Sequence, residues 1–529
     1  MNTIYSTTKF LLLLIIGASA ILITTRCTTN IDSEIALSPD FPNYHVNYSD
    51  SISDVQSQFD TEMWKTFVAL CWPADGFIPS STGNITDNTD ARAVFENYSF
   101  NYDLFLLNVR DTTTFEPVGW GESDALNQQR QARWARWHQH SELCPDLVAE
   151  ANAKGITNMA QIIPLDEFIQ ASNKGRPHVP LVDLNETIVW SSVVFNQATF
   201  DFVTENELYS ANGIEKVKNN VEKMEVHHVK SRDSSGQTIY IDTTITQYVN
   251  QLEDNDGAIH LKTSWKIMGD GDDTTKFHTA WGALLFNNLN FADDTTWQPQ
   301  CALVQVGLVG MHIAIKTEDQ PSSIWATFEH VDNCPEVELI QNKHYNFYNS
   351  ASSNPENIVP NANDSLPKAL AEDPYWFNPD GSTINPLGQV VREIPITAAT
   401  KTLNASYQQA LANTVWANYQ LVSTQWMEPT TQIVYPTFLS NTTLETFDQL
   451  GSSCFGCHHQ VTANTLKGGP NNEQFTMDNY PIGNVLNVSL YYSKSKLPPG
   501  TIDTAIYADY MWSLLKWEES GHLTWKQTK

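Results

Sequence analysis

The chain has 529 residues and a mass of 59.5 kDa, enough for about two to four domains that each bury a core. Hydrophobic residues make up 41% of it and aromatic residues 11%, a composition that excludes general disorder. Its 30 Lys and Arg oppose 60 Asp and Glu, and the formal charge of −30 excludes nucleic-acid binding. Beyond the N-terminus no apolar stretch reaches membrane length, which excludes a polytopic membrane protein.

Residues 1–26 are typical of an export signal. The uncharged run at 10–25 has 16 residues, fewer than the roughly 20 needed to span a bilayer core. The small residues at 18–20 form a candidate cleavage site. Cys27 is a candidate for lipidation, although Arg26 stands where bacterial lipoproteins have a small residue. An uncleaved anchor is the third alternative. We therefore expect an exported protein, periplasmic or at the cell surface, that contacts a membrane only through its N-terminus.

The segment that follows, 27–60, is rich in polar residues and is predicted to be a linker. Residues 61–348 are predicted to form one or two α+β domains. They begin with a helix whose apolar positions follow a helical spacing from Trp64 to Cys71. Strict alternation predicts a strand over 259–267, and the apolar run 301–316 is typical of an interior strand. A central, mainly antiparallel sheet is expected.

Residues 349–390 contain many Asn, Ser, Pro and Asp residues and are predicted to be a linker or surface excursion. Beyond them, 391–529 is predicted to be a mostly α-helical domain, because Tyr407, Leu411, Val415 and Tyr419 recur every four residues. The fold class expected for the whole chain is therefore α+β with a separate helical C-terminal domain.

Seven cysteines are present, and an exported chain can form disulfides. With Cys27 and a close pair at 454 and 457 set aside, four disulfide candidates remain: Cys71, Cys144, Cys301 and Cys334. Cys71 with Cys144 and Cys301 with Cys334 are the favoured pairs, since each closes the shorter loop. The alternative for Cys71 is a buried thiol on an apolar helix face.

One motif carries recognisable chemistry. Residues 454–458 read Cys454-Phe455-Gly456-Cys457-His458, the C-x-x-C-H pattern of covalent haem attachment. Two thiols at this spacing form thioethers to one porphyrin, and the following His458 is the proximal axial ligand of the iron. This part of the chain resembles c-type cytochromes in those three residues. The resemblance implies one covalent haem c in the helical domain.

A second block is similar to one in large exported bacterial proteins of the cytochrome c family. It comprises Gly310–Ile313 and Trp325–Asn333, and in those proteins it precedes a single C-terminal haem motif, as it does here. Two other interpretations of the motif remain. A redox dithiol or disulfide needs only Cys454 and Cys457, and a metal site would need further ligands such as His459.

The sixth ligand of the iron decides between electron transfer and ligand chemistry. The candidates are Met477, which lies in a Gly- and Asn-rich loop, Met511, His312 and His330, and a site without a protein ligand is the remaining alternative. Met511 also fits an apolar helix row, and both histidines also fit as core residues.

Three functions follow. The first is an exported mono-haem c-type cytochrome that exchanges single electrons with a partner protein. The second is a haem-dependent oxidoreductase, peroxidase-like or oxidising a small molecule, that uses the large α+β region as its substrate domain. The third is a non-redox surface binding protein.

Overall fold

The computed structural model describes residues 35–87, 91–105, 116–168, 180–205 except 186, 207, 209, 229–232, 238–241, 257–286, 299–317, 320, 323–337, 343–357 except 354, and 389–458 except 432. The chain divides into two units, Met1–Leu37 and Ser38–Lys529, and every element below belongs to the second. No helix in these ranges is both long enough and apolar enough to span a bilayer.

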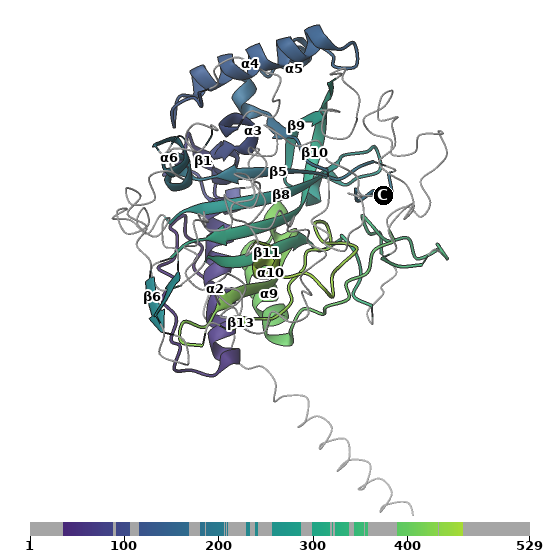
Figure 1. Ribbon diagram of the computed structural model, residues 1–529. Coiled ribbons are helices and arrows are strands. Elements are labelled where there is room, and N and C mark those ends of the chain that lie inside the picture. Colours follow the sequence, from purple (N-terminus) through teal and green to yellow (C-terminus); the bar gives the residue numbers. More distant parts are fainter. Residues whose placement is uncertain are drawn as a thin grey trace, which may run out of the picture. The chain divides into compact units, whose positions relative to one another are not determined.

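Nine strands form one sheet in the order β13-β12-β11-β10-β8-β5-β3, with β9 on β10 and β4 on β9 (Figure 1). All of its paired strands are antiparallel except β4 and β9. The strands are β3 (Ser99–Phe100), β4 (Ile163–Leu165), β5 (Trp190–Phe195), β8 (Ile259–Ile267), β9 (Thr279–Phe286), β10 (Gln300–Ile315), β11 (Ile324–His330), β12 (Tyr419–Met427) and β13 (Val434–Tyr435).

The remaining elements cover this sheet or connect its strands. The helices are α2 (Ile52–Leu70), α3 (Asn101–Leu104), α4 (Ser123–His140), α5 (Leu147–Ala153), α6 (Gln197–Glu205), α9 (Ala398–Ala410) and α10 (Cys454–His458). Two-stranded pairs are formed by β1 (Ala74–Asp75) with β2 (Ile78–Pro79) and by β6 (Val229–Arg232) with β7 (Thr238–Ile241). Short 3₁₀ turns lie at Ile85–Asp87, Val94–Asn97, Met159–Gln161, Thr274–Lys276 and Val415–Asn418.

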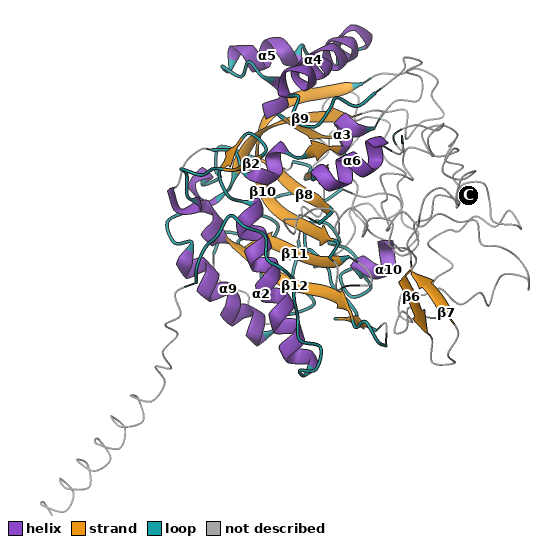
Figure 2. Ribbon diagram, turned by 90° about the vertical axis from the view of Figure 1, so that its left-hand side faces the viewer, coloured by secondary structure: helices purple, strands orange, loops and turns teal. Residues whose placement is uncertain are grey.

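The long strand β10 organises the sheet. One edge of it pairs with β8, while the other pairs first with β9 and then with β11. The predicted strands at 259–267 and 301–316 are confirmed as β8 and β10. Because successive side chains of a strand point to opposite faces, the sheet has two distinct sides. Figure 2 shows α2 and α9 on one side, which we call the helical face, and α10 on the other, the motif face.

Aromatic packing fixes the helical face. The Trp64 ring of α2 stacks on Tyr407 of α9 with centroids 4.7 Å apart, and Phe67 stacks on Phe328 of β11 at 4.2 Å. The indole nitrogen of Trp64 donates to Asn404 Oδ1 at 2.8 Å. These large side chains are fully buried, and each buried aromatic of this kind contributes roughly 2–3 kcal/mol through apolar burial. The helix predicted at 64–71 is thus the C-terminal part of α2.

A buried carboxylate joins the two helices to the sheet. Asp60 Oδ1 accepts the Thr424 amide at 3.0 Å, and its Oδ2 accepts the Thr400 hydroxyl at 2.7 Å. Burial raises the pKa of Asp60, against these hydrogen bonds, which lower it. Helix α2 begins at Ile52, inside the segment predicted to be a linker. That segment looked polar because only Val55, Phe59 and Asp60 of its helical part are buried while the rest faces solvent.

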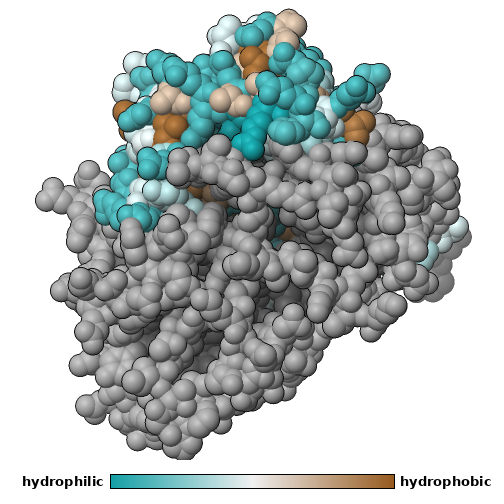
Figure 3. All heavy atoms as spheres, turned by 45° about the horizontal axis from the view of Figure 1, so that its top comes forward, coloured by the Kyte–Doolittle hydropathy of each residue, from teal (hydrophilic) through white to brown (hydrophobic). Residues whose placement is uncertain are grey.

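The hairpin of α4 and α5 covers the far end of the sheet. Arg130, Trp134 and Trp137 point inward from α4 at intervals of four and three residues, as expected for an amphipathic helix. Arg130 is completely buried and forms two hydrogen bonds with the carboxylate of Asp103, at 2.9 and 2.6 Å. The outward surface is largely hydrophilic (Figure 3).

A disulfide joins Cys144, between α4 and α5, to Cys301 at the start of β10, with Cα atoms 4.6 Å apart. The favoured pairing is therefore wrong. It rested on the shorter loop, whereas the sheet brings together residues separated by 157 positions. Cys71 and Cys334 are thiols. Burial raises the pKa of both, to about 12 for Cys334, so both are unreactive at neutral pH.

The predicted helical C-terminal domain is wrong for the described part of 391–529, and with it the fold class. Strands β12 and β13 lie in the same large antiparallel sheet as β10, so residues 391–458 complete this sheet. The four-residue recurrence from Tyr407 to Tyr419 misled because it runs through three different elements: the end of α9, a 3₁₀ turn and the first residue of β12. Helix α9 ends at Ala410, and Tyr419 begins β12. Residues 459–529 and most of the segment 349–390 lie outside the described residues.

We predict that replacing both Cys144 and Cys301 by Ala lowers the free energy of unfolding by about 2–5 kcal/mol, since the bond closes a long loop. Urea unfolding without reductant measures this. A non-reducing peptide map should link these two cysteines, and a Cys71–Cys144 or Cys301–Cys334 peptide would contradict the structure.

Candidate functional site

The motif helix α10 is anchored to the sheet by one buried amide. Gln425 of β12 accepts the Phe455 amide on its Oε1 at 3.0 Å, and its Nε2 donates to the Ser453 hydroxyl at 3.0 Å. The same Nε2 donates to the Pro436 carbonyl at 2.7 Å, which ties in the chain after β13. Gln425 is fully buried. The first turn of α10 therefore has a fixed position on the motif face.

An apolar wall lies beneath α10. Cys454 and Phe455 pack with Ala314, Trp325, Met427 and Val434, which come from the adjacent strands β10, β11, β12 and β13. At the other end of the helix the His458 imidazole lies over the Trp325 indole, with ring centroids 4.3 Å apart. The haem-motif cysteine and histidine are thus held against one side of the sheet, away from α2 and α9.

A row of side chains extends from this wall across the sheet. In register, Trp325 of β11 lies opposite Ala314 of β10, Ala314 opposite His260 of β8, and His260 opposite Phe195 of β5. All four therefore point to the motif face. The edge of the Phe195 ring packs on His260, with centroids 5.3 Å apart.

Two buried polar atoms in this row have no hydrogen-bond partner among the described residues. They are Nε2 of His260 and Nε1 of Trp325. Burial, together with the smaller effect of the charge on nearby His458, lowers the pKa of His260 to about 3. His260 is consequently neutral at neutral pH. An unpartnered buried polar atom costs roughly 1–3 kcal/mol, and these two lie on one face of the sheet beside the same motif.

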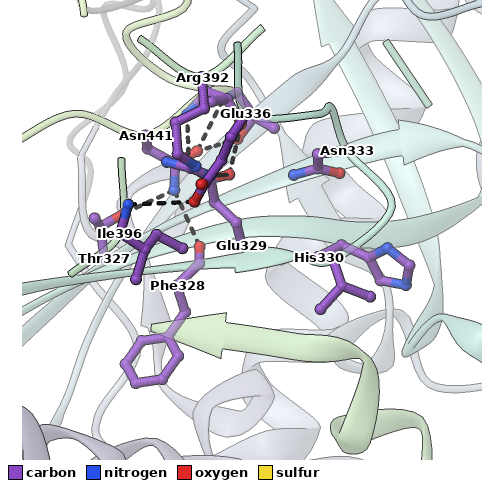
Figure 4. A network of polar contacts seen from close by, with 12 residues as sticks. Thr327, Phe328, Glu329, His330, Asn333, Glu336, Arg392, Ile396 and Asn441 are labelled. Carbon is purple, nitrogen blue, oxygen red and sulfur yellow. Dashed lines mark hydrogen bonds and ion pairs between the residues drawn. The ribbon is translucent and has the colours of Figure 1, made fainter. Parts of the chain in front are cut away.

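A buried ion pair fixes the loop that leads into α10. The carboxylate of Glu329, on β11, forms an ion pair with Arg392. The same carboxylate accepts the amide and the hydroxyl of Thr442, both at 2.6 Å. The Glu329 side chain is fully buried and that of Arg392 nearly so. Figure 4 shows Arg392, Glu329 and Asn441 converging on this point.

The same loop contacts β10 and β11 through short polar side chains. Asn441 Nδ2 donates to Thr327 Oγ1 at 2.7 Å and to the Phe328 carbonyl at 3.0 Å. The loop lies so close to β10 that a Cβ atom on Gly310 would be 2.3 Å from the Thr443 hydroxyl. Gly310 is thus needed for the close approach of the loop. Glu445 accepts the Asn441 amide through Oε2 at 2.8 Å and contacts His312 Nε2 through Oε1 at 3.0 Å.

The described sixth-ligand candidates are occupied elsewhere. His330 points to the helical face, where its ring stacks on Phe277 at 4.2 Å. Its Nε2 donates to the Lys276 carbonyl and its Nδ1 accepts the Asp332 amide. His312 is on the motif face, but its Nε2 contacts Glu445, which leaves only Nδ1, next to Cβ, without a described partner. Met477, Met511 and His459, like Cys27, lie outside the described residues.

The residues present fit a covalent haem c. One helical turn supplies both cysteines and His458, an apolar wall lies under it, and two unpartnered polar atoms lie beside it. Within the described ranges no group of three or more His, Cys, Asp or Glu side chains is arranged to hold a metal ion by itself.

Sequence reasoning missed three residues of this site: Gln425, Met427 and His260. His260 occupies the polar side of the alternating strand at 259–267, where a histidine ordinarily faces solvent. Only the strand order places it two strands from Trp325, and strand order is not encoded in any local pattern.

Comparison with protein-family models, with curated proteins and with solved structures finds no match to this chain.

We predict that Glu329→Gln lowers the free energy of unfolding by about 3–5 kcal/mol, because Arg392 would be left buried without a counter-charge. The matched control is Lys401→Met, which removes a half-exposed ion pair with Glu336 and should cost under about 1 kcal/mol. Urea unfolding followed by Trp fluorescence compares the two. Equal midpoints for both variants would contradict the role of the buried pair.

We predict that the buried His330 side chain makes the free energy of unfolding fall in acid. Burial lowers its pKa to about 4 from 6.5, partly opposed by Asp332. Between these pH values the unfolded chain binds a proton that the folded chain does not, so stability is complete above pH 6.5 and falls toward pH 4, by roughly 3 kcal/mol. In His330→Gln this part of the pH dependence should vanish. His140→Gln, at the exposed end of α4, should keep it, and identical slopes for all three proteins would refute the assignment.

Proposed function

We propose that the protein is an exported mono-haem c-type cytochrome that exchanges single electrons with a partner protein. The observation that carries the proposal is the Cys454–His458 motif, which is held as one helical turn on a buried apolar wall. Bound there, a haem supplies reversible one-electron redox chemistry of its iron.

The residues of this chain have separate tasks in that function. Cys454 and Cys457 would hold the haem through two thioethers, and the His458 imidazole would bind its iron. Trp325 lies against the His458 ring and restricts its rotation. Gln425 and the Glu329–Arg392 pair hold the start of α10 and the loop before it. A ligand held by a rigid sheet moves little between redox states, which favours fast electron transfer.

The apolar wall affects the potential as well. Ala314, Met427, Val434 and Phe455 are buried and exclude water from one side of the site. A low local dielectric disfavours the additional positive charge of ferric haem, so burial raises the reduction potential. Polar substitutions in this wall should therefore lower the reduction potential.

We predict that the chain, expressed with its N-terminal signal in a host with haem c maturation, retains haem through denaturation and gives sharp α and β bands on reduction. Replacing both Cys454 and Cys457 by Ser should abolish this retention. Cys71→Ala, a buried thiol far along the chain, is the matched control and should leave it intact.

The outcomes separate the functions. Retained haem that is reduced and reoxidised without consuming peroxide supports the cytochrome. Peroxide-dependent turnover at an open iron would instead indicate a haem oxidoreductase. If no haem is retained, the cytochrome proposal fails and the motif is a dithiol or disulfide on a binding protein.

A further inference from the structure

We infer that His260 is the sixth ligand of the haem iron, so that the haem is bound between His458 and a histidine contributed by the sheet. The inference rests on the proposed function, and it adds the distal residue of that same site. It predicts a closed, six-coordinate iron in both redox states.

The position of His260 carries the first part of the argument. His458 lies over Trp325, and His260 is on the same face, two strands away in the same register row. Two strand spacings amount to about 10 Å. Ala314 lies between them and contributes only a methyl group, so no large side chain of this row separates the two imidazoles.

The unsatisfied nitrogen carries the second part. Nε2 of His260 is buried and has no hydrogen-bond partner among the described residues, while its ring is bordered by the apolar edge of Phe195. A histidine in such a place is destabilising unless something binds that nitrogen. Nε2 is the nitrogen farther from the backbone and the usual one for metal ligation. Trp325 Nε1, unpartnered in the same row, is a donor available to a haem propionate.

The competing ligands in the described structure are weaker. His330 faces the opposite side, and both of its nitrogens are hydrogen-bonded. His312 lies two residues along β10 from Ala314, about 7 Å away, and its Nε2 contacts Glu445. Met427 packs in the wall beside Cys454, but a buried thioether needs no partner, so its burial is already explained as core packing.

The test begins with the wild-type holoprotein. Low-temperature electron paramagnetic resonance of the ferric protein should show a low-spin haem with two imidazole ligands, and carbon monoxide should bind the ferrous protein slowly. His260→Ala should lose the low-spin signal, bind carbon monoxide rapidly, and regain the low-spin spectrum when free imidazole is added. His260→Phe keeps a ring against Phe195 but has no nitrogen. It should therefore leave the sixth coordination position of the iron without a protein ligand, as His260→Ala does.

Matched controls remove the competing ligands one at a time. Met427→Leu and His312→Gln alter the same face and should keep the bis-imidazole spectrum. Circular dichroism and haem retention report whether each variant is folded, and where His260→Ala fails to fold, His260→Phe is the deciding variant.

Two results would overturn the inference while the cytochrome proposal stands. One is a wild-type spectrum of histidine–methionine or high-spin haem. The other is a bis-imidazole spectrum that survives both substitutions at His260. A wild-type protein that retains no haem is a separate result, because it removes the proposed function itself.

Discussion

The carboxylate of Glu329 is the contact on which the candidate site depends. It lies near the C-terminal end of β11 without access to water, and it pairs with Arg392 and accepts hydrogen bonds from the amide and hydroxyl of Thr442. A buried charge is tolerated only where it is fully paired, so these three segments have essentially one mutual arrangement. The loop that continues from Thr442 ends at Cys454. The position of the Cys454–His458 motif therefore depends on the buried Glu329–Arg392 pair, through Thr442, which lies twelve residues before Cys454.

The two faces of the sheet are covered by different kinds of contact. Helices α2 and α9 cover the helical face through stacked aromatic rings. The Cys454–His458 motif lies on the opposite face. The motif face is covered instead by a loop held through Asn441, Glu445 and Gln425. Directional hydrogen bonds specify position more narrowly than apolar contact does. This polar cover therefore fixes the position of the Cys454–His458 motif more closely than apolar contacts alone would.

Local patterns in the sequence predicted the local features correctly. The alternation at 259–267 gave β8, the apolar run gave β10, and the spacing around Trp64 gave the inner part of α2. Features that depend on contacts between distant segments were not accessible. The Cys144–Cys301 bond, the entry of residues 419–427 into the sheet and the alignment of His260 with Trp325 all follow from strand order. The motif itself was visible because its five residues act as one local unit.

The packing of α2 has a consequence for how the chain is made. Trp64 meets its hydrogen-bond partner 340 residues later, Asp60 meets Thr424 after 364, and Gln56 meets Trp426 after 370. Synthesis proceeds from the N-terminus, so the apolar side of this helix is produced first and completed almost last. The contacts of Trp64 and Phe67 with α9 and β12 can form only after most of the chain has been synthesised, and a topology of such high contact order folds slowly.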